Sequence, residues 1–151
     1  MPYWKQQTWN KKPKTKVQTS PIDLAERRAW GWFSKYIRLR DCLATTRTKV
    51  CFKCISCKKI TPFAWNDAGH FITIACKATK FDERNVYAQC QTCNRYQQGN
   101  WDKMYTAILA IHGQDTINEL LALRNTLVRN IDYDALSEIY RLKYNELCKQ
   151  T

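Results

Sequence analysis

The chain has 151 residues, a mass of 17.9 kDa and a formal net charge of +12 at pH 7. This length suits one domain, and hydrophobic residues make up 44% of the chain, which predicts a packed core and excludes global disorder. No run approaches the roughly 20 apolar residues of a membrane-spanning helix, and the start, MPYWKQQTWNKK, lacks the apolar segment of a secretory signal. We therefore expect a cytoplasmic protein without a membrane partner.

The positive charge is concentrated in the first part of the chain. Residues 1–64 contain 15 basic and 3 acidic residues, whereas residues 65–151 contain 10 of each. Tryptophans are interleaved with the basic residues at positions 4, 9, 30 and 32. A concentrated positive field with interleaved aromatic rings is typical of proteins that bind nucleic acid.

Two basic segments are predicted before the first cysteine. Residues 1–19 are rich in Lys, Gln and Thr without a hydrophobic period, which indicates a flexible basic arm. A basic helix is predicted over residues 20–41, with Ser20 as its N-cap and Pro21 in its first turn. Gly31 in the middle of this helix indicates a kink or a close approach. Helical spacing assigns its apolar face to Leu24, Trp30, Phe33 and Ile37.

The remainder divides into a cysteine-rich centre and a helical end, so the fold class is α+β. Residues 42–100 carry cysteine clusters and short β-branched runs, typical of a small irregular β unit. Residues 101–151 have helical periodicity, with Asn100 and Asp132 as candidate caps and Gly113 as a helix end. The apolar positions include Ile108, Ile111, Ile117, Leu120, Leu121, Leu127 and Val128. These helices either form a homodimer interface or cover the centre, and the sequence leaves both open.

Two Cys-x-x-Cys pairs, Cys54/Cys57 and Cys90/Cys93, indicate a structural zinc site. The two-residue gap lets each pair present two sulfurs to one ion, and two pairs complete a tetrahedral Zn²⁺ site. Cys51 and Cys54 have the same spacing, so Cys51 in place of Cys57 is an alternative register. The isolated cysteines are expected to be small buried hydrophobic residues: Cys42, Cys76 and Cys148.

A histidine and several oxygen donors lie between and beside these pairs. His70 can take a proton from water near neutral pH, and Asp67 with nearby amides can hold a hard divalent cation. Taken singly, His70 would be a structural histidine, Asn85 a turn residue and Asn94 a helix cap. The other histidine, His112, precedes Gly113 and is expected to be structural.

The combined spacing resembles that of the HNH (ββα-metal) nucleases. In these enzymes a histidine ends the first strand, an asparagine lies five residues before the second Cys-x-x-Cys, and a His or Asn follows its last cysteine; here these are His70, Asn85 and Asn94. The surrounding segments look like the phage lambda NinG, or Rap, recombination endonuclease family over Phe33 to about Arg124. They read SKYIRLRD (34–41), AGHF (68–71), ATKFDERNVYAQCQTCN (78–94) and QGN (98–100).

This resemblance implies a zinc-stabilised ββα-metal module within residues 42–100 that cleaves branched DNA, such as Holliday junctions and D-loops, with Mg²⁺ or Mn²⁺. His70 would be the general base, Asn85 would orient its imidazole, and Asn94 would bind the catalytic ion. Asp67 is the candidate second ligand, because Gly69 stands where the commonest HNH pattern has the metal ligand. The implied location is the host-cell cytoplasm.

Basic side chains near these motifs are the candidate DNA contacts: Arg27, Arg28, Lys35, Arg38, Arg40, Arg84 and Arg95. Arg84 and Arg95 border the HNH-like motif and would clamp a phosphate, or would be solvated surface residues. Two other functions remain open from the sequence. One is a non-catalytic zinc-ribbon protein that binds nucleic acid, and the other is a restriction or homing nuclease of the HNH type.

Overall fold

The computed structural model describes residues 19–150, so the predicted arm lies outside the described residues except for Thr19. The protein is a mixed α+β structure, as predicted. Its elements are α1 (Pro21–Thr46), β1 (Cys51–Lys53), β2 (Ile60–Pro62), η2 (Phe63–Trp65), β3 (Asn66–His70), β4 (Val86–Cys90), η3 (Thr92–Tyr96), α2 (Trp101–Leu123) and α3 (Tyr133–Lys149). No helix in this part of the chain is long and apolar enough to cross a membrane.

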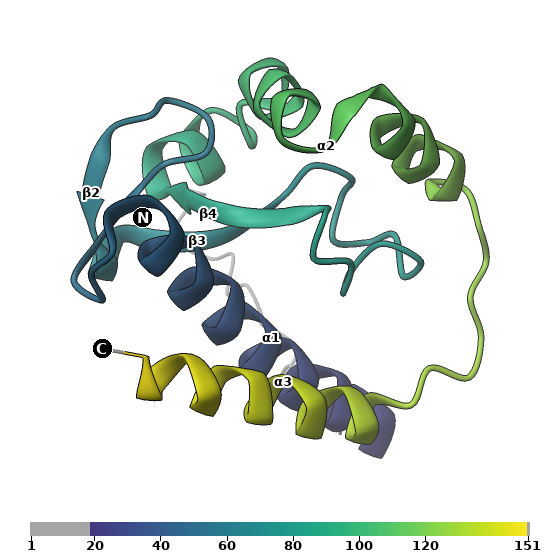
Figure 1. Cartoon of the computed structure of the whole chain (residues 1–151). Coiled ribbons are helices and arrows are strands. Elements are labelled where there is room, and N and C mark those ends of the chain that lie inside the picture. The colour runs from purple at the N-terminus through teal and green to yellow at the C-terminus, as the bar shows by residue number, and fades with distance from the viewer. Residues whose placement is uncertain (1–18, 151) are drawn as a thin grey trace, which may run out of the picture.

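The antiparallel hairpin β3–β4 lies between α2 on one side and α1 with α3 on the other (Figure 1). Alternation along β4 explains this layering, because successive side chains point to opposite faces of a strand. Val86 packs with Phe33 and Ile37 of α1 and with Tyr140 of α3. Tyr87 packs on the other face with apolar side chains of α2: Met104, Ile108, Ile117 and Leu120.

α1 and α3 pack side by side and run in the same direction. Arg28 pairs with Asp134 near their N-terminal ends, and Lys49 donates to the Cys148 carbonyl near the other ends. α3 begins as predicted, since the Asp132 side chain accepts a hydrogen bond from the Ala135 amide. The two helices thus form the layer beneath the hairpin.

α1 begins as predicted but is longer than expected. Ser20 accepts a hydrogen bond from the Asp23 amide, and Pro21 lies in the first turn. The helix passes the predicted end at residue 41 because Asp41 and Cys42 are buried, and it ends where Arg47 turns into the left-handed region. Gly31 does not mark a close approach, since the space that a Cβ would occupy there is open, and α1 continues through it without a non-helical residue. Leu24, expected on the apolar face, is exposed.

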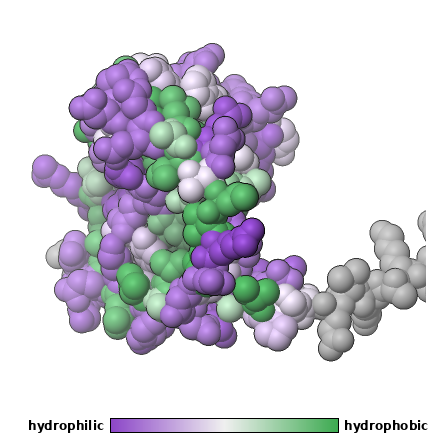
Figure 2. Space-filling model, turned by 90° about the vertical axis from the view of Figure 1, so that its right-hand side faces the viewer, coloured by the Kyte–Doolittle hydropathy of each residue, from purple (hydrophilic) through white to green (hydrophobic). Residues whose placement is uncertain are grey.

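α2 departs from prediction at three places. The Asn100 side chain does not cap it but donates to Cys93 Sγ and Gln97 Oε1. Gly113 (φ 82°, ψ 175°) is non-helical and ends the first helical stretch of α2, as predicted, but Ile111, predicted to be buried, is exposed. Helix then continues only to Leu123, so the predicted apolar positions Leu127 and Val128 fall in the non-helical segment 124–132. This segment follows the side of the molecule seen in Figure 2, where hydrophobic patches show between hydrophilic ones.

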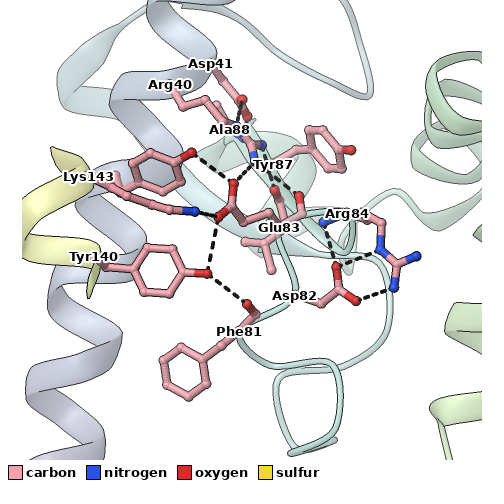
Figure 3. Close-up of polar contacts among 12 residues, drawn as sticks. Arg40, Asp41, Phe81, Asp82, Glu83, Arg84, Tyr87, Ala88, Tyr140 and Lys143 are labelled. Atoms are coloured by element: carbon pink, nitrogen blue, oxygen red, sulfur yellow. Dashed lines mark hydrogen bonds and ion pairs between the residues drawn. The ribbon is translucent and has the colours of Figure 1, made fainter. Parts of the chain in front are cut away.

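A polar network around Glu83 fixes the loop before β4 to both helices of the lower layer (Figure 3). The Glu83 carboxylate accepts hydrogen bonds from Tyr36, Tyr140 and Lys143. Arg40 of α1 donates to the Glu83 and Val86 carbonyls and pairs with Asp41. Asp41 in turn accepts a bond from the Ala88 amide of β4. The segments SKYIRLRD and FDERN therefore carry residues that position the hairpin.

Candidate metal centre and active site

Four sulfurs come together where the two small sheets meet. Cys54 and Cys57 follow β1, Cys90 ends β4 and Cys93 lies in η3, and their Sγ atoms are all within 4.8 Å of one another. A tetrahedral ion with Zn–S bonds of about 2.3 Å would space its sulfurs by about 3.8 Å. The Cys57 and Cys90 sulfurs are 3.8 Å apart, so this donor set fits a structural zinc ion. The choice of Cys57 over Cys51 agrees with the structure.

The remaining cysteines have separate surroundings. Cys51 Sγ lies 3.3 Å from Thr48 Oγ1, Cys42 is buried and accepts from the Asn66 amide, and Cys76 is buried in the core that α2 covers. Cys148, in the last turn of α3, is exposed, so its predicted burial is wrong.

The loop between β3 and β4 is organised by Asn85, whose side chain is fully buried. Its Oδ1 accepts a hydrogen bond from the Ile72 amide (2.7 Å), and its Nδ2 donates to the carbonyls of Ile72 (3.0 Å) and Thr79 (2.9 Å). Through these bonds the side-chain oxygen of Asn85 and both of its side-chain N–H groups are bound to the backbone of the loop. The expected hydrogen bond from Asn85 to the imidazole of His70 is therefore wrong, because Asn85 orders the loop instead.

The His70 ring is held by two groups that the sequence interpretation did not assign. Its Nε2 lies 3.1 Å from the Lys80 carbonyl, and the indole of Trp30 stacks on it at 5.0 Å between centroids and 27° between planes. A carbonyl only accepts hydrogen bonds, so Nε2 carries the proton and Nδ1 is the acceptor nitrogen. Burial, opposed by the bond to Lys80, lowers the pKa of His70 to about 4. The ring is thus neutral at pH 7.

His70, Asn94 and Asp67 line two adjoining hollows. The first has a volume of about 570 Å³ and is lined by His70, Asn94 and Trp101 among others. The second, of about 390 Å³, is lined by Asp67, Asn94 and Arg95, with Trp30 and Arg38 of α1. Asn94 in η3 and Ala68 in β3 border both hollows. The structure therefore places a neutral histidine and a carboxylate at two adjoining hollows that share the Asn94 amide as a lining group.

Asp67 is already bound by neighbouring side chains. Arg95 donates to both of its carboxylate oxygens (2.7 Å each), and Asn94 Nδ2 donates to Oδ2 (3.1 Å). Burial raises the pKa of Asp67, but the bonds from Arg95 and Asn94 outweigh it and lower the pKa. The carboxylate is therefore ionised, and Arg95 balances its charge.

Gly69 cannot be replaced by a metal-binding side chain in this structure. A Cβ at position 69 would collide with Oε1 of Gln89, whose side chain is fully buried. Gln89 Nε2 donates to Ser56 Oγ and to the Gly99 carbonyl, which fixes the amide in that place. The Gln89 side chain on β4 thus leaves no room at position 69 for the metal-binding side chain of the common HNH pattern.

The basic candidates are found in different surroundings. Arg38 and Arg95 lie at the hollow beside Asp67, and Arg27 and Lys35 are exposed on α1. Arg28 is exposed and pairs with Asp134, whereas Arg84 is held by Asp82 and Glu119. Arg40 is largely buried, with its guanidinium bonded inside the Glu83 network, so its position favours a structural role. His112 likewise makes an internal contact, a hydrogen bond with the Tyr87 hydroxyl.

Trp30 and the Lys80 carbonyl are the site groups that sequence reasoning missed. The helical spacing assigned Trp30 to a buried helix face but gave no sign that this face meets His70. A backbone carbonyl carries no side-chain signal, and only the loop conformation set by Asn85 brings residue 80 to the imidazole. The pairing of α1 with the hairpin was therefore the missing information.

The fold and the cysteine centre define a small α+β protein with a four-sulfur metal site beside a cluster of His, Asn and Asp. The model of the family described as Bacteriophage Lambda NinG protein matches residues 4–151, and the chain belongs to this family. Protein ninG of Escherichia phage 933W is 37% identical over 73 residues, and that of Escherichia phage lambda is 36% identical over 73 residues. Protein ninG of Salmonella phage P22 is 48% identical over 48 residues.

The matched segments cover only part of each protein. They span 48% of this chain against 36% of the 933W protein and 35% of the lambda protein, and 31% of this chain against 23% of the P22 protein. The chain thus aligns with about a third of the length of the curated relatives it matches. No solved structure matches this chain.

Proposed function

We propose that the protein is an HNH-type endonuclease that hydrolyses phosphodiester bonds in branched DNA, such as Holliday junctions and D-loops, with Mg²⁺ or Mn²⁺ as the catalytic ion. The observation that carries this proposal is the state of His70. Its imidazole is neutral, is fixed by Lys80 and Trp30, and keeps Nδ1 as the acceptor nitrogen, and the residue lines a hollow that Asn94 also lines. A protein that only binds DNA does not need a histidine prepared in this way.

The chemistry assigned to His70 is general base catalysis. Because Nε2–H is bound to the Lys80 carbonyl, Nδ1 takes a proton from a water molecule in the adjoining hollow. The hydroxide forms a bond to phosphorus while the bond to the leaving 3′-oxygen breaks, and that oxygen takes a proton from solvent. Trp30 keeps the imidazole plane in place during this transfer.

Asp67 and Asn94 would hold the divalent cation in this proposal. Carboxylate and amide oxygens are donors that Mg²⁺ and Mn²⁺ prefer, and the two side chains already touch. When bound there, the ion would supply charge neutralisation at the non-bridging and leaving oxygens. Arg95 is half-exposed and would transfer part of its hydrogen bonding from Asp67 to a DNA phosphate.

The basic side chains of α1 would position the DNA. Arg38 lies at the hollow beside Asp67, and Arg27 and Lys35 extend the positive surface along the helix. Such contacts read phosphates and not base sequence, which agrees with a substrate defined by its branching. Such an enzyme would act in the cytoplasm of the host cell. A homodimer would supply two active sites to a junction, and it stays a prediction.

The test is a cleavage assay on a four-way junction and on a linear duplex of the same sequence, with Mg²⁺ or Mn²⁺. We expect the wild type to cleave the junction and His70→Ala to be slower by about 10²–10⁴-fold, the usual contribution of a general base. His112→Ala is the matched control, because it removes the only other histidine. Cleavage retained by His70→Ala would refute the assignment, and equal cleavage of the linear duplex would indicate an HNH enzyme of the restriction or homing type.

One observation favours a second function, a zinc-containing protein that binds DNA without cleaving it. Arg95 occupies both oxygens of Asp67, so the candidate cation site is charge-balanced without an ion. In that case the wild type and His70→Ala would bind the junction equally and neither would cleave it.

A further inference from the structure

A groove beside the cysteine centre contains the two most exposed aromatic side chains of the described residues. Its volume is about 640 Å³, and it lies between the β2–η2 segment on one side and η3 with the start of α2 on the other. Trp65 is 61% exposed and Tyr96 is 81% exposed, and both line it. Exposed apolar surface that is gathered in one place is typical of binding sites, so two bare rings in one groove make it a candidate.

The chemistry of the lining favours a nucleic acid strand. Lys59 and Lys103 are its charged side chains, and no Asp or Glu of the described residues lines it. A metal-loaded centre of four thiolates carries a negative charge that these lysines offset, so phosphate attraction alone is weak here. Stacking is therefore the main attraction, because aromatic rings bind the faces of unpaired bases of any sequence. Bases in a duplex are already stacked and do not offer these faces.

The groove also lies next to the candidate active site along the chain. Trp65 is two residues from Asp67, and Tyr96 is two residues from Asn94. Two residues span at most about 7 Å of backbone, so the Cα atom of each aromatic residue lies within about that distance of a residue assigned to the cation. η3 separates the two regions, with Asn94 and Arg95 on the catalytic side and Thr92 and Tyr96 on the groove side.

We propose that this groove binds unpaired bases of a DNA strand by stacking them on Trp65 and Tyr96, next to the phosphate that is to be cleaved. The position of the bound bases beside a cleaved phosphate rests on the proposed nuclease function, but binding of the strand can be measured without cleavage. It gives the protein a means of selecting branched DNA, since unpaired strands occur at branch points and D-loops and not in a continuous duplex.

The test measures the affinity of the full chain, without divalent cations, for a fluorescent single-stranded oligonucleotide and for a duplex of the same length. We expect Trp65→Ala and Tyr96→Ala each to weaken single-strand binding by roughly 5- to 100-fold, the loss that removal of one base–aromatic stack implies. Duplex affinity should change less than about twofold. Trp65→Phe and Tyr96→Phe should bind like the wild type, because they keep a stacking ring.

Leu127→Ala is the matched control, since Leu127 is an exposed hydrophobic residue outside the groove. Equal losses on single strand and duplex, or no loss on either, would overturn the proposal, and a groove that captures a protein segment gives the second result. Photocrosslinking of a bromouridine-containing oligonucleotide provides a check on folded wild-type protein: crosslinks at Trp65 or Tyr96 support the proposal, and crosslinks confined to α1 contradict it. If these binding results overturn the proposal, junction cleavage that still depends on His70 would show that the nuclease function stands and that only this inference has failed.

Discussion

Glu83 holds together the parts of the chain that support the candidate active site. Burial raises its pKa, but the hydrogen bonds from Lys143 and Tyr36 and the charges of Lys143 and Arg40 outweigh burial and lower it. Because folding lowers this pKa, the carboxylate stabilises the fold at pH values above the pKa of the unfolded chain, which is about 4.5. This stabilisation is lost as the pH falls through the pKa of the folded protein. We expect Glu83→Gln to lower the free energy of unfolding at pH 7 by about 1.5–3 kcal/mol, the usual contribution of hydrogen bonds to a charged group.

The measurement is urea denaturation of wild type and variant between pH 7 and pH 3. The two curves should converge at the acid end, because the wild-type carboxyl is then protonated and neutral like the glutamine. Glu138→Gln is the control, since Glu138 pairs with Arg141 on the exposed surface of α3. A constant difference between wild type and Glu83→Gln across this pH range would contradict the role of the charge.

Single residues were predicted well where chemistry alone decides their use. The four cysteines come together as their spacing indicated, and Asn94 lines one hollow with His70 and a second hollow with Asp67. The assignments that depended on neighbours were poorer: Asn85 binds its own loop, and the donors of Arg40 are used within the fold. A side chain's identity shows what it can bind, but only the tertiary structure decides which partner is within reach.

At the scale of elements, two glycines of helical segments are expected to respond to alanine in opposite directions. Gly31 lies inside α1 with open space where a Cβ would be, so Gly31→Ala should stabilise the protein by about 0.5–1 kcal/mol. Gly113 has φ 82° and ψ 175°, a conformation that L-residues rarely adopt, so Gly113→Ala should destabilise it by about 1–3 kcal/mol. Thermal denaturation followed by circular dichroism measures both. The same sign for the two variants would contradict this account of α1 and α2.

Helices were easier to predict than strands because they extend over several periods. α1, α2 and α3 have 26, 23 and 17 residues, whereas the strands have 3 or 5. The end of α1 was misplaced because burial of Asp41 and Cys42 continues the helix past its apolar pattern. Leu127 and Val128 kept an apolar pattern after α2 had ended, and only the path of segment 124–132 shows why they are not helical.

For the whole molecule, the order of the layers could not be read from the chain. β4 is buried on both faces, so it has no alternation of apolar and polar residues that would place one side in solvent. α3, more than 40 residues after β4, completes the core around Phe33 and Val86 through Tyr140. The candidate active site therefore depends on contacts between α1, the hairpin and the end of the chain.

The cysteine centre is expected to control the stability of this entire arrangement. The core around it is small, formed by Phe52 and Ala88 together with cysteines, four of which are the proposed ligands. A structural zinc ion contributes roughly 10–16 kcal/mol to folding, as much as the roughly 5–15 kcal/mol net stability of a typical domain. We expect one zinc ion per chain, and unfolding of the β1–β2 and β3–β4 sheets in Cys90→Ser and after removal of the metal with a strong chelator.

Metal content by mass spectrometry and thermal denaturation by circular dichroism measure this result. Cys148→Ser is the matched control, because Cys148 is exposed and lies outside the four-sulfur cluster, and it should keep both metal and stability. α1 and α3 pack through Phe33, Ile37 and Tyr140 without the cysteines, so part of the helical signal should survive in Cys90→Ser. A Cys90→Ser variant that retains one zinc ion and the wild-type melting temperature would show that the ligand set is wrong.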